Sequence, residues 1–455
     1  MKKLIVLGLA LIIFGAKPQL KAQTNPTLAF DSIIDSFYKA DEPGGVALVA
    51  QHGNIIYNRA FGMASLELNV PMQPDMLFEI GSMTKQFTSV CILQLMEQGK
   101  LDVKEPINKY ITDGPAQWQP VTIEHLLTHT SGITDMPGST NTLKDVIGLY
   151  TPKPLTFAPG TKRVYSNIDY NILGFIIEKV SGMPYQDYLE KNILTPLGMA
   201  HTFYGSNSRI IPGRVPAYTR KKSGKGFENS YMFIAPSAAG ALLSTTADLL
   251  KWNQALTAGK LIKQETLDKA WTSYHLTDGK NTHYGYGWET GGTIQGSPIV
   301  EHGGVAVGYL TDAIYLPKED IYVAVLTNQR GILPEIIAAN LAAIAIGKHR
   351  QMQQINLTDS TFQLYAGVYR DNADSSLKNI TLENHHLYYQ RADGGPKMEM
   401  KPYAADCFFF DNTSILGQAI RDGQHRITGL LLFNNRYMSE PTSTLNKTDM
   451  PLPVH

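Results

Sequence analysis

The sequence has little cysteine and no excess of charge of either sign. Its 455 residues include 2 cysteines, Cys91 and Cys407, so a disulfide framework is excluded and stability must come from a buried core. We expect two buried free thiols; one bridge between different parts of the chain is the alternative. Because 40 basic residues balance 40 acidic ones, no net field would hold nucleic acid or an anionic membrane surface.

Long apolar runs are also missing after the N-terminal segment. A helix that spans a bilayer needs about 20 apolar residues, and no later run is that long. The apolar run Leu4–Ala16 follows Lys2 and Lys3, a pattern typical of a secretory signal peptide (residues 1–22) cleaved after Ala22. We therefore expect an exported protein, periplasmic or extracellular, with no stable membrane insertion after the signal is removed. An uncleaved N-terminal anchor is the alternative.

The chain has more residues than one domain with a single hydrophobic core usually contains, which predicts a large domain and a smaller one. Residues 27–348 mix strand-like and helix-like patterns, whereas 361–455 consist of short alternating runs divided by turn residues. The polar stretch 349–360 between them is predicted to be a linker. The C-terminal part is expected to be a small all-β domain.

Within residues 27–348, strands are predicted near both ends and helices between them. The segment 45–60 reads as a hairpin that turns at Gly53-Asn54. Further strands are expected at 283–288, 296–301, 309–316 and 321–328, and helices at 82–99, 170–180 and 246–256. This order predicts an α+β fold in which one antiparallel sheet is closed by both ends of the segment and carries an inserted helical region.

The first candidate catalytic element is Ser82-Met83-Thr84-Lys85, which opens a predicted helix. Residues three apart share one helix face, so the hydroxyl of Ser82 and the amine of Lys85 can meet. Burial disfavours the charge of a lysine, which can then help to deprotonate the serine. The spacing alone is weak evidence, since Ser375 and Lys378 repeat it in the β-rich part.

The second element is Tyr165-Ser166-Asn167, which precedes another predicted helix. A tyrosine hydroxyl beside a lysine cation is easier to ionise, so Tyr165 can act as base toward the serine and as acid toward the leaving group. Asn167 can donate to a substrate carbonyl and accept from Lys85. A core tyrosine followed by a helix-capping asparagine is the alternative.

The third element is His302-Gly303-Gly304-Val305, which follows a predicted strand. Glycines let a ligand lie close to the strand, and the N–H of Val305 can pair with that of Ser82 to hold an oxyanion. An ordinary turn with a surface histidine is the alternative. Lys222-Ser223-Gly224 is a closer literal match to a Lys-Thr/Ser-Gly motif, but its polar surroundings indicate a loop.

Together and in this order, the three elements resemble the serine β-lactamase-like superfamily, in particular its branch of class C β-lactamases, D-alanyl-D-alanine carboxypeptidases and esterases (peptidase family S12). Supporting stretches, all within residues 30–345, are FEIGSMTKQFTS, HLLTHTSGI, FAPGTKRVYSN, TPLGMAHTF, SAAGALLSTTADLLKW and EHGGVAVGY. The resemblance implies an acyl-enzyme with no metal or cofactor, in which Ser82 is the nucleophile, Lys85 and Tyr165 carry protons, and Asn167 contacts the substrate. It also implies that His125 and His129 belong to a structural loop and that the C-terminal part is a lipocalin-like barrel, which in some members caps or gates the active site.

One triplet departs from the β-lactamases, which have Lys-Thr-Gly where this chain has His302-Gly303-Gly304. A mostly neutral histidine binds a carboxylate less well than a lysine near pH 7. We therefore expect a small amide, peptide or ester substrate in place of a β-lactam. A penicillin-binding protein with slow deacylation and a non-catalytic binding protein are the alternatives, and the sequence leaves the oligomeric state open.

Overall fold

The computed structural model describes residues 26–135, 143–221, 226–230, 237–347, 354–372, 374–394, 397–410, 415–433, 441 and 443–452. The predicted signal peptide, the first residues of the predicted linker and Lys222-Ser223-Gly224 lie outside these residues. Among the described residues, no helix combines the length and the apolar character required to cross a membrane.

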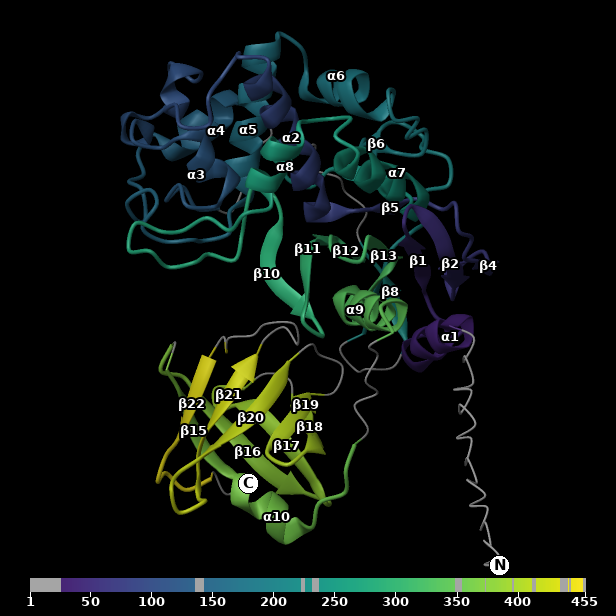
Figure 1. Cartoon of the computed structure of the whole chain (residues 1–455), viewed down its shortest axis with the longest axis vertical. Coiled ribbons are helices and arrows are strands. Elements are labelled where there is room, and N and C mark those ends of the chain that lie inside the picture. Colours follow the sequence, from purple (N-terminus) through teal and green to yellow (C-terminus); the bar gives the residue numbers. More distant parts are fainter. Residues whose placement is uncertain are drawn as a thin grey trace, which may run out of the picture.

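A six-stranded antiparallel sheet forms the centre of the N-terminal part (Figure 1). Its order is β10-β11-β12-β13-β1-β2, so the first two strands of the chain pair at one edge of the four consecutive strands β10–β13. Gly45 pairs with Thr327, and the register continues to Gln51 opposite Ile321. The predicted closure of one sheet by both ends of the segment is confirmed. The strands are β1 (Gly45–Gln51), β2 (Asn54–Phe61), β10 (Glu289–Ile294), β11 (Ser297–Ala306), β12 (Tyr309–Leu316) and β13 (Ile321–Thr327).

Both faces of this sheet are covered, as the alternation along β1 shows. Ala47 and Val49 point into a core shared with α1 (Pro26–Phe37) and α9 (Pro334–Ala345). Val46 and Leu48 point into the core of the inserted helical region. Since successive side chains of a strand face opposite sides, a continuous apolar run is what a sheet buried on both faces requires.

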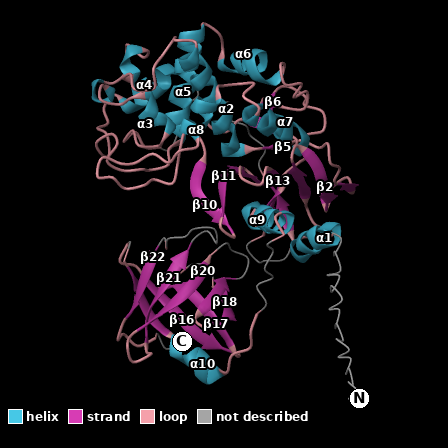
Figure 2. Cartoon of the chain, in the orientation of Figure 1, coloured by secondary structure: helices cyan, strands magenta, loops and turns pink. Residues whose placement is uncertain are grey.

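The inserted region is mostly helical (Figure 2). Helix α2 (Thr84–Glu97) lies at its centre and is buried along almost its whole length, with Phe87 stacked on Trp252 at a ring-centroid distance of 3.9 Å. Helix α5 (Asn167–Ser181) ends at Gly182, whose φ of 71° gives the left-handed conformation of a helix C-cap. The other helices are α3 (Ile123–Leu127), α4 (Leu143–Tyr150), α6 (Tyr185–Leu189), α7 (Thr246–Thr257) and α8 (Gln264–Ala270).

Two element predictions are wrong in detail. Residues 283–288 form no strand, because His283 has a φ of 53° and Gly287 a φ of 91°, and neither is an extended conformation; strand β10 begins only at Glu289. Helix α5 begins at Asn167, three residues before the predicted start at Tyr170. This earlier start places Asn167 in the first turn of the helix.

The C-terminal part is a closed eight-stranded barrel, as predicted for an all-β unit. It follows α10 (Asp359–Tyr365), which lies partly within the predicted linker, and it encloses a core of its own that includes Tyr369, Leu387 and Phe408. Figure 1 shows the barrel on the side of the main sheet where α9 and the tip of the β10–β11 hairpin lie. Its strands are β15 (Gly367–Asp371), β16 (Leu377–Glu383), β17 (His386–Arg391), β18 (Met398–Ala404), β19 (Cys407–Phe410), β20 (Leu416–Arg421), β21 (Ile427–Phe433) and β22 (Ser443–Lys447).

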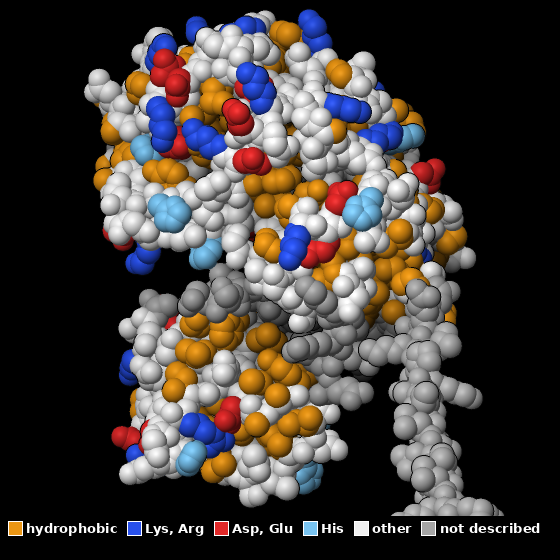
Figure 3. All heavy atoms as spheres, viewed as in Figure 1, with side chains coloured by type: hydrophobic (Ala, Val, Ile, Leu, Met, Phe, Trp, Pro, Cys, Tyr) orange, Lys and Arg blue, Asp and Glu red, His pale blue; other side chains and the backbone are white. Residues whose placement is uncertain are grey.

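Both cysteines are free, so the alternative of one bridge is wrong. Cys91 in α2 is buried as expected, whereas Cys407 at the start of β19 is only partly buried. On the face of the molecule that Figure 3 shows, basic and acidic side chains are interspersed, in line with the zero net charge.

Candidate active site

The candidate nucleophile lies on a short turn pressed against β11. Ser82 is part of a 3₁₀ turn (Gly81–Met83) that leads directly into α2. A Cβ atom at Gly304 would lie 1.9 Å from the carbonyl oxygen of Ile80, and one at Gly81 would lie 2.7 Å from the backbone nitrogen of Val305. Glycine is therefore required at both positions for β11 to approach the serine turn this closely.

The hydroxyl of Ser82 contacts both predicted proton carriers. Lys85 Nζ lies 3.1 Å from Ser82 Oγ, and the hydroxyl of Tyr165 donates to the same oxygen at 2.6 Å. Lys85 also donates to Asn167 Oδ1 and to the carbonyl oxygen of Ala239, each at 2.9 Å. The structure thus brings together four residues that the sequence predicted for the site, from segments more than 80 positions apart.

Burial makes Lys85 a weak base for a lysine. Its side chain is completely buried, and the loss of solvation lowers its pKa from 10.5 to about 7, although Asp135 and Asp169 act in the opposite direction. Near neutral pH a large fraction of Lys85 is therefore uncharged and able to accept a proton from Ser82.

Tyr165 behaves differently from the sequence-based expectation that a lysine cation makes it easier to ionise. Burial raises its pKa to about 12, and the hydrogen bond with Ser82 only partly offsets this, although 40% of the residue is exposed. The expectation is wrong because burial, the largest cause of the shift, outweighs the groups that lower the pKa of Tyr165. Tyr165 is consequently a neutral donor in the resting site.

A residue that the sequence analysis missed orients Asn167. The carboxylate of Asp135 accepts hydrogen bonds from the backbone N–H groups of Asn167 (2.9 Å) and Ile168 (2.8 Å), and from the side-chain amide of Asn167 (2.9 Å). A carboxylate at a helix N-terminus accepts hydrogen bonds from otherwise unpaired N–H groups and interacts favourably with the helix dipole. Asp135 lies 32 positions before Asn167, so no local spacing in the sequence marks it as the cap of α5.

His302 is placed on β11 as predicted but is buried, with 3% of its surface exposed. Its Nε2 lies 3.0 Å from the hydroxyl of Tyr284 and its Nδ1 2.6 Å from the carbonyl oxygen of Gly303. Burial, followed by the charge of Lys85, lowers the pKa of His302 to about 3, so the ring is neutral at pH 7. The guanidinium of Arg163 lies 4.4 Å from the Tyr284 ring centroid.

Glycines 303 and 304 and Val305 continue β11 past the serine turn. Val305 is 57% exposed and its backbone nitrogen lies beside Gly81, the residue before Ser82. The pairing of the Val305 and Ser82 N–H groups as an oxyanion site stays a prediction, as do the substrate contacts of His302, Gly303 and Gly304.

The remaining candidates lie away from this centre or serve the fold. In the second Ser-x-x-K copy, Lys378 in β16 donates to Ser376 Oγ at 2.6 Å, a serine two positions away and not the Ser375 that begins the motif. His125 accepts from the backbone N–H of Thr122 at 3.1 Å and caps α3. No group of three or more His, Cys, Asp or Glu side chains in the described part of the chain is arranged to hold a metal ion.

Comparison with known proteins identifies the family. The sequence model of the Beta-lactamase family matches residues 30–347, which is more than half of the chain. The chain belongs to the Beta-lactamase family. The resemblance predicted from the motifs is thereby confirmed, and this member of the Beta-lactamase family is a serine hydrolase.

Relatives within the Beta-lactamase family include penicillin-binding protein 4* of Bacillus subtilis (strain 168). It is 28% identical over 417 residues, a match covering 84% of this chain and 91% of that protein. The octameric penicillin-binding protein homologue from Pyrococcus abyssi has a similar structure, with a TM-score of 0.66, 25% identity, and coverage of 92% of this chain and 99% of that one. Coverage this high extends beyond the family match into the barrel.

The fold is also that of the D-amino acid amidase from Ochrobactrum anthropi SV3 complexed with D-phenylalanine, with a TM-score of 0.58 and 23% identity. That match covers 66% of this chain and 91% of the amidase.

Proposed function

We propose that this serine hydrolase acts through an acyl-enzyme on Ser82 and hydrolyses a small amide, peptide or ester. The observation that carries the proposal is the position of Ser82 Oγ within hydrogen-bond distance of both Lys85 Nζ and the Tyr165 hydroxyl. A nucleophile held between a base and an acid is the arrangement that acyl transfer requires.

In the proposed acylation, the neutral amine of Lys85 takes the proton of Ser82 as Oγ attacks the substrate carbonyl carbon. The carbon–nitrogen or carbon–oxygen bond then breaks, and the leaving group takes a proton from Tyr165. The ammonium of Lys85 returns a proton to Tyr165, which restores the neutral pair. Water repeats these steps in deacylation and releases the acid product and free Ser82.

The substrate carbonyl would lie between Asn167 and β11. Asn167 offers its side-chain amide, and the N–H groups of Ser82 and Val305 would hold the oxygen that becomes negative in the transition state. His302, neutral and buried, offers no charge to a substrate carboxylate, and this supports an amide, peptide or ester substrate over a β-lactam. No cofactor is needed for these steps.

A penicillin-binding protein with slow deacylation is the second candidate, and its support is the similarity to penicillin-binding protein 4*. The two functions differ in the lifetime of the acyl-enzyme. Intact-mass spectrometry during incubation with benzylpenicillin measures that lifetime, and a parallel assay with acyl-amino-acid amides and esters measures turnover. A transient penicillin adduct with turnover of an amide or ester supports the hydrolase, whereas a persistent adduct without turnover of either supports the penicillin-binding protein.

We further propose that the protein is exported to the periplasm or the medium and that residues 1–22 are removed. The support is the order of charged and apolar residues from Lys2 to Ala16. N-terminal sequencing of the protein recovered from the periplasm or medium should begin at Gln23. A mature protein that begins at Met1 and stays with the membrane fraction would support the uncleaved anchor.

The chain is also proposed to consist of a hydrolase domain (27–348) joined to a β domain (361–455). The separate core of the barrel supports this division. Limited proteolysis should cut first within 349–360 and leave two folded fragments.

A further inference from the structure

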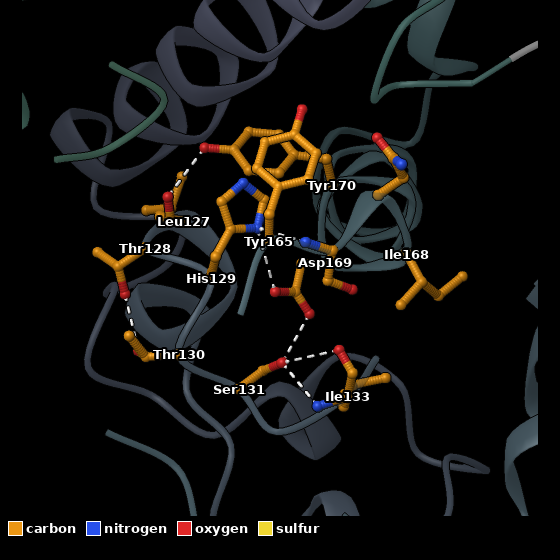
Figure 4. Close-up of polar contacts among 12 residues, drawn as sticks. Leu127, Thr128, His129, Thr130, Ser131, Ile133, Tyr165, Ile168, Asp169 and Tyr170 are labelled. Atoms are coloured by element: carbon orange, nitrogen blue, oxygen red, sulfur yellow. Dashed lines mark hydrogen bonds and ion pairs between the residues drawn. The ribbon is translucent and has the colours of Figure 1, made fainter. Parts of the chain in front are cut away.

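Beneath Tyr165, outside the groups that the proposed reaction uses, lies a pair of completely buried titratable side chains (Figure 4). His129, in the loop after α3, and Asp169, in the first turn of α5, are each 0% exposed, and His129 Nδ1 lies 3.4 Å from Asp169 Oδ2. The sequence marked His129 only as part of a structural loop, and nothing marked Asp169.

His129 holds the backbone on both sides of Tyr165. Its carbonyl oxygen accepts from the N–H of Val164 at 3.0 Å, and its ring Nδ1 accepts from the N–H of Ser166 at 3.3 Å. Its ring also packs against that of Tyr165 at a centroid distance of 4.4 Å. One residue therefore fixes the ring and both flanking peptide groups of the side chain that donates to Ser82.

This double contact uses an uncommon backbone conformation. His129 has a φ of 57°, in the left-handed region that few residues other than glycine adopt, although histidine, asparagine and aspartate adopt it more often than the others. In this conformation the carbonyl group and the ring of His129 both face the extended segment that contains Tyr165.

The hydrogen bond from Ser166 determines where the hydrogens of the pair lie. Because Nδ1 of His129 accepts, it carries a lone pair, and an ionised carboxylate oxygen 3.4 Å away would repel it. Asp169 Oδ2 has no hydrogen-bond partner within the described part of the chain, so a protonated carboxyl could direct its hydrogen toward Nδ1 and remove this repulsion. The other carboxyl oxygen, Oδ1, accepts from Ser131 Oγ at 2.7 Å. Burial acts in the same direction, since it raises the pKa of Asp169 well above its usual range and lowers that of His129 well below.

Other titratable groups surround the pair. Lys85, Arg163 and His302 lower the pKa of His129; Asp135 raises the pKa of Asp169, and Lys85 lowers it. An ionised Asp169 would favour the charged form of Lys85, so a neutral carboxyl leaves Lys85 able to act as a base.

We propose that His129 and Asp169 are positioning residues that hold Tyr165 against Ser82. Asp169 is protonated, with its hydrogen between Asp169 Oδ2 and His129 Nδ1, so the pair adds no negative charge beside Lys85. This inference rests on the proposed function of Ser82, Lys85 and Tyr165. Neither residue contacts Ser82 Oγ in the structure, and both act through Tyr165 and its backbone.

The test compares variants at both positions by the rate at which a fluorophosphonate acylates the full-length protein. His129→Asn keeps a residue that tolerates the left-handed backbone but removes the ring, and should lower the acylation rate by about 10²-fold, the cost of a small misplacement of a reacting group. His125→Asn, a histidine on the preceding helix, is the matched control and should stay within about threefold of the wild type. Thermal unfolding of each variant separates slow acylation of folded protein from loss of fold.

Asp169 is tested by a pair of substitutions. Asp169→Ala should lose most of the acylation rate, and Asp169→Asn should restore most of it, because an amide also donates to Nδ1 and accepts from Ser131. If the two residues formed an ion pair, Asp169→Asn would lose as much of the acylation rate as Asp169→Ala, since asparagine could not replace a carboxylate beside an imidazolium. Equal losses in both variants would overturn the hydrogen between Asp169 and His129, and an unchanged rate in folded His129→Asn would overturn the positioning role.

An infrared difference spectrum between the wild type and Asp169→Asn at neutral pH gives a readout that does not depend on activity. We expect the carbonyl band of a protonated carboxyl group to disappear in the variant; loss of a carboxylate band instead would contradict the neutral pair. Failure of wild-type labelling would overturn the proposed function of Ser82, whereas the infrared result would still decide the state of Asp169.

Discussion

The carboxylate of Asp135 accepts two hydrogen bonds from Asn167, one from its backbone N–H and one from its side-chain amide, both at 2.9 Å. The second bond determines which end of the amide faces Lys85, because the NH₂ group points to Asp135 and the oxygen remains for the amine. Asp135 therefore links the start of α5 to the orientation of the candidate base.

Replacing Asp135 with alanine should lower both stability and acylation. Loss of a helix cap costs about 1 kcal/mol, and an Asn167 amide free to rotate should slow acylation by about tenfold through misplacement of Lys85. Thermal unfolding and fluorophosphonate labelling measure the two effects. The control is Thr245→Ala, which removes the cap that accepts from Asp248 N–H at the start of α7 and should lower stability alone. Equal labelling rates in both variants would contradict the role of Asp135.

The rate of acylation should rise with pH through about 7, because Lys85 must lose its proton to act as a base and its pKa is about 7. Labelling rates of the wild type across this range, at constant ionic strength, give the profile. A rate that falls over the same interval, or that rises only near pH 10, would mean that Lys85 acts in its charged form or is not the titrating group.

The same group makes stability depend on pH. The folded pKa of Lys85 is lowered from 10.5 to about 7, so between these values the unfolded chain binds more protons and the free energy of unfolding increases with pH. Lys85→Met removes this contribution. The unfolding free energy of the variant relative to the wild type should therefore be highest at about pH 6 and decline toward alkaline pH. A difference independent of pH would contradict the lowered pKa.

Tyr165→Phe should slow amide substrates far more than activated esters. As a general acid, Tyr165 contributes about 10²–10⁴-fold when the leaving group needs a proton. A nitrophenolate leaves without one, so the ester should lose much less. Acylation rates of the variant, taken as kcat/KM on an amide and a nitrophenyl ester with the same acyl group, give the comparison, and equal losses would rule out the acid role in acylation.

Gly304→Ala should separate β11 from the serine turn, because the new methyl group would lie 1.9 Å from the Ile80 carbonyl oxygen and 2.4 Å from Thr311 Oγ1. We expect acylation to fall by about 10²-fold. Gly148→Ala in α4 is the control, since within the described residues no atom outside its own helix backbone and chain neighbours lies within 4 Å of its Cβ position. This control should gain up to about 1 kcal/mol of helix stability and label at the wild-type rate.

Much of the fold could be predicted because its signals are local. The hairpin around Gly53-Asn54, the apolar runs of β12 and β13, and the alternating runs of the barrel each show the periodicity of the element they form. The segment 283–288 was predicted incorrectly because its aromatic residues suggest a strand, whereas His283 and Gly287 have positive φ angles. Contacts distant in sequence matter here, since a Cβ at Gly287 would lie 2.5 Å from Ser89 Oγ.

The motifs also predicted which residues meet at Ser82, but not the groups that orient them. Asp135 and Asp169 reach the site through the fold of the loop after α3 and the first turn of α5, and neither has a diagnostic neighbour in sequence. The burial of His302 behind Tyr284 was equally unpredictable, because the sequence around β11 gives no sign of which residue covers it.

The central claim is that Ser82 is the nucleophile, and site-mapped labelling tests it most directly. The wild type, Ser82→Ala and Ser375→Ala would be treated with a fluorophosphonate and analysed by intact-mass and peptide mass spectrometry; Ser375 is the matched control because it begins the second Ser-x-x-K copy. We expect one adduct on Ser82 in the wild type and in Ser375→Ala, and none in Ser82→Ala. An adduct that persists in folded Ser82→Ala, or that maps to another residue, would contradict the account.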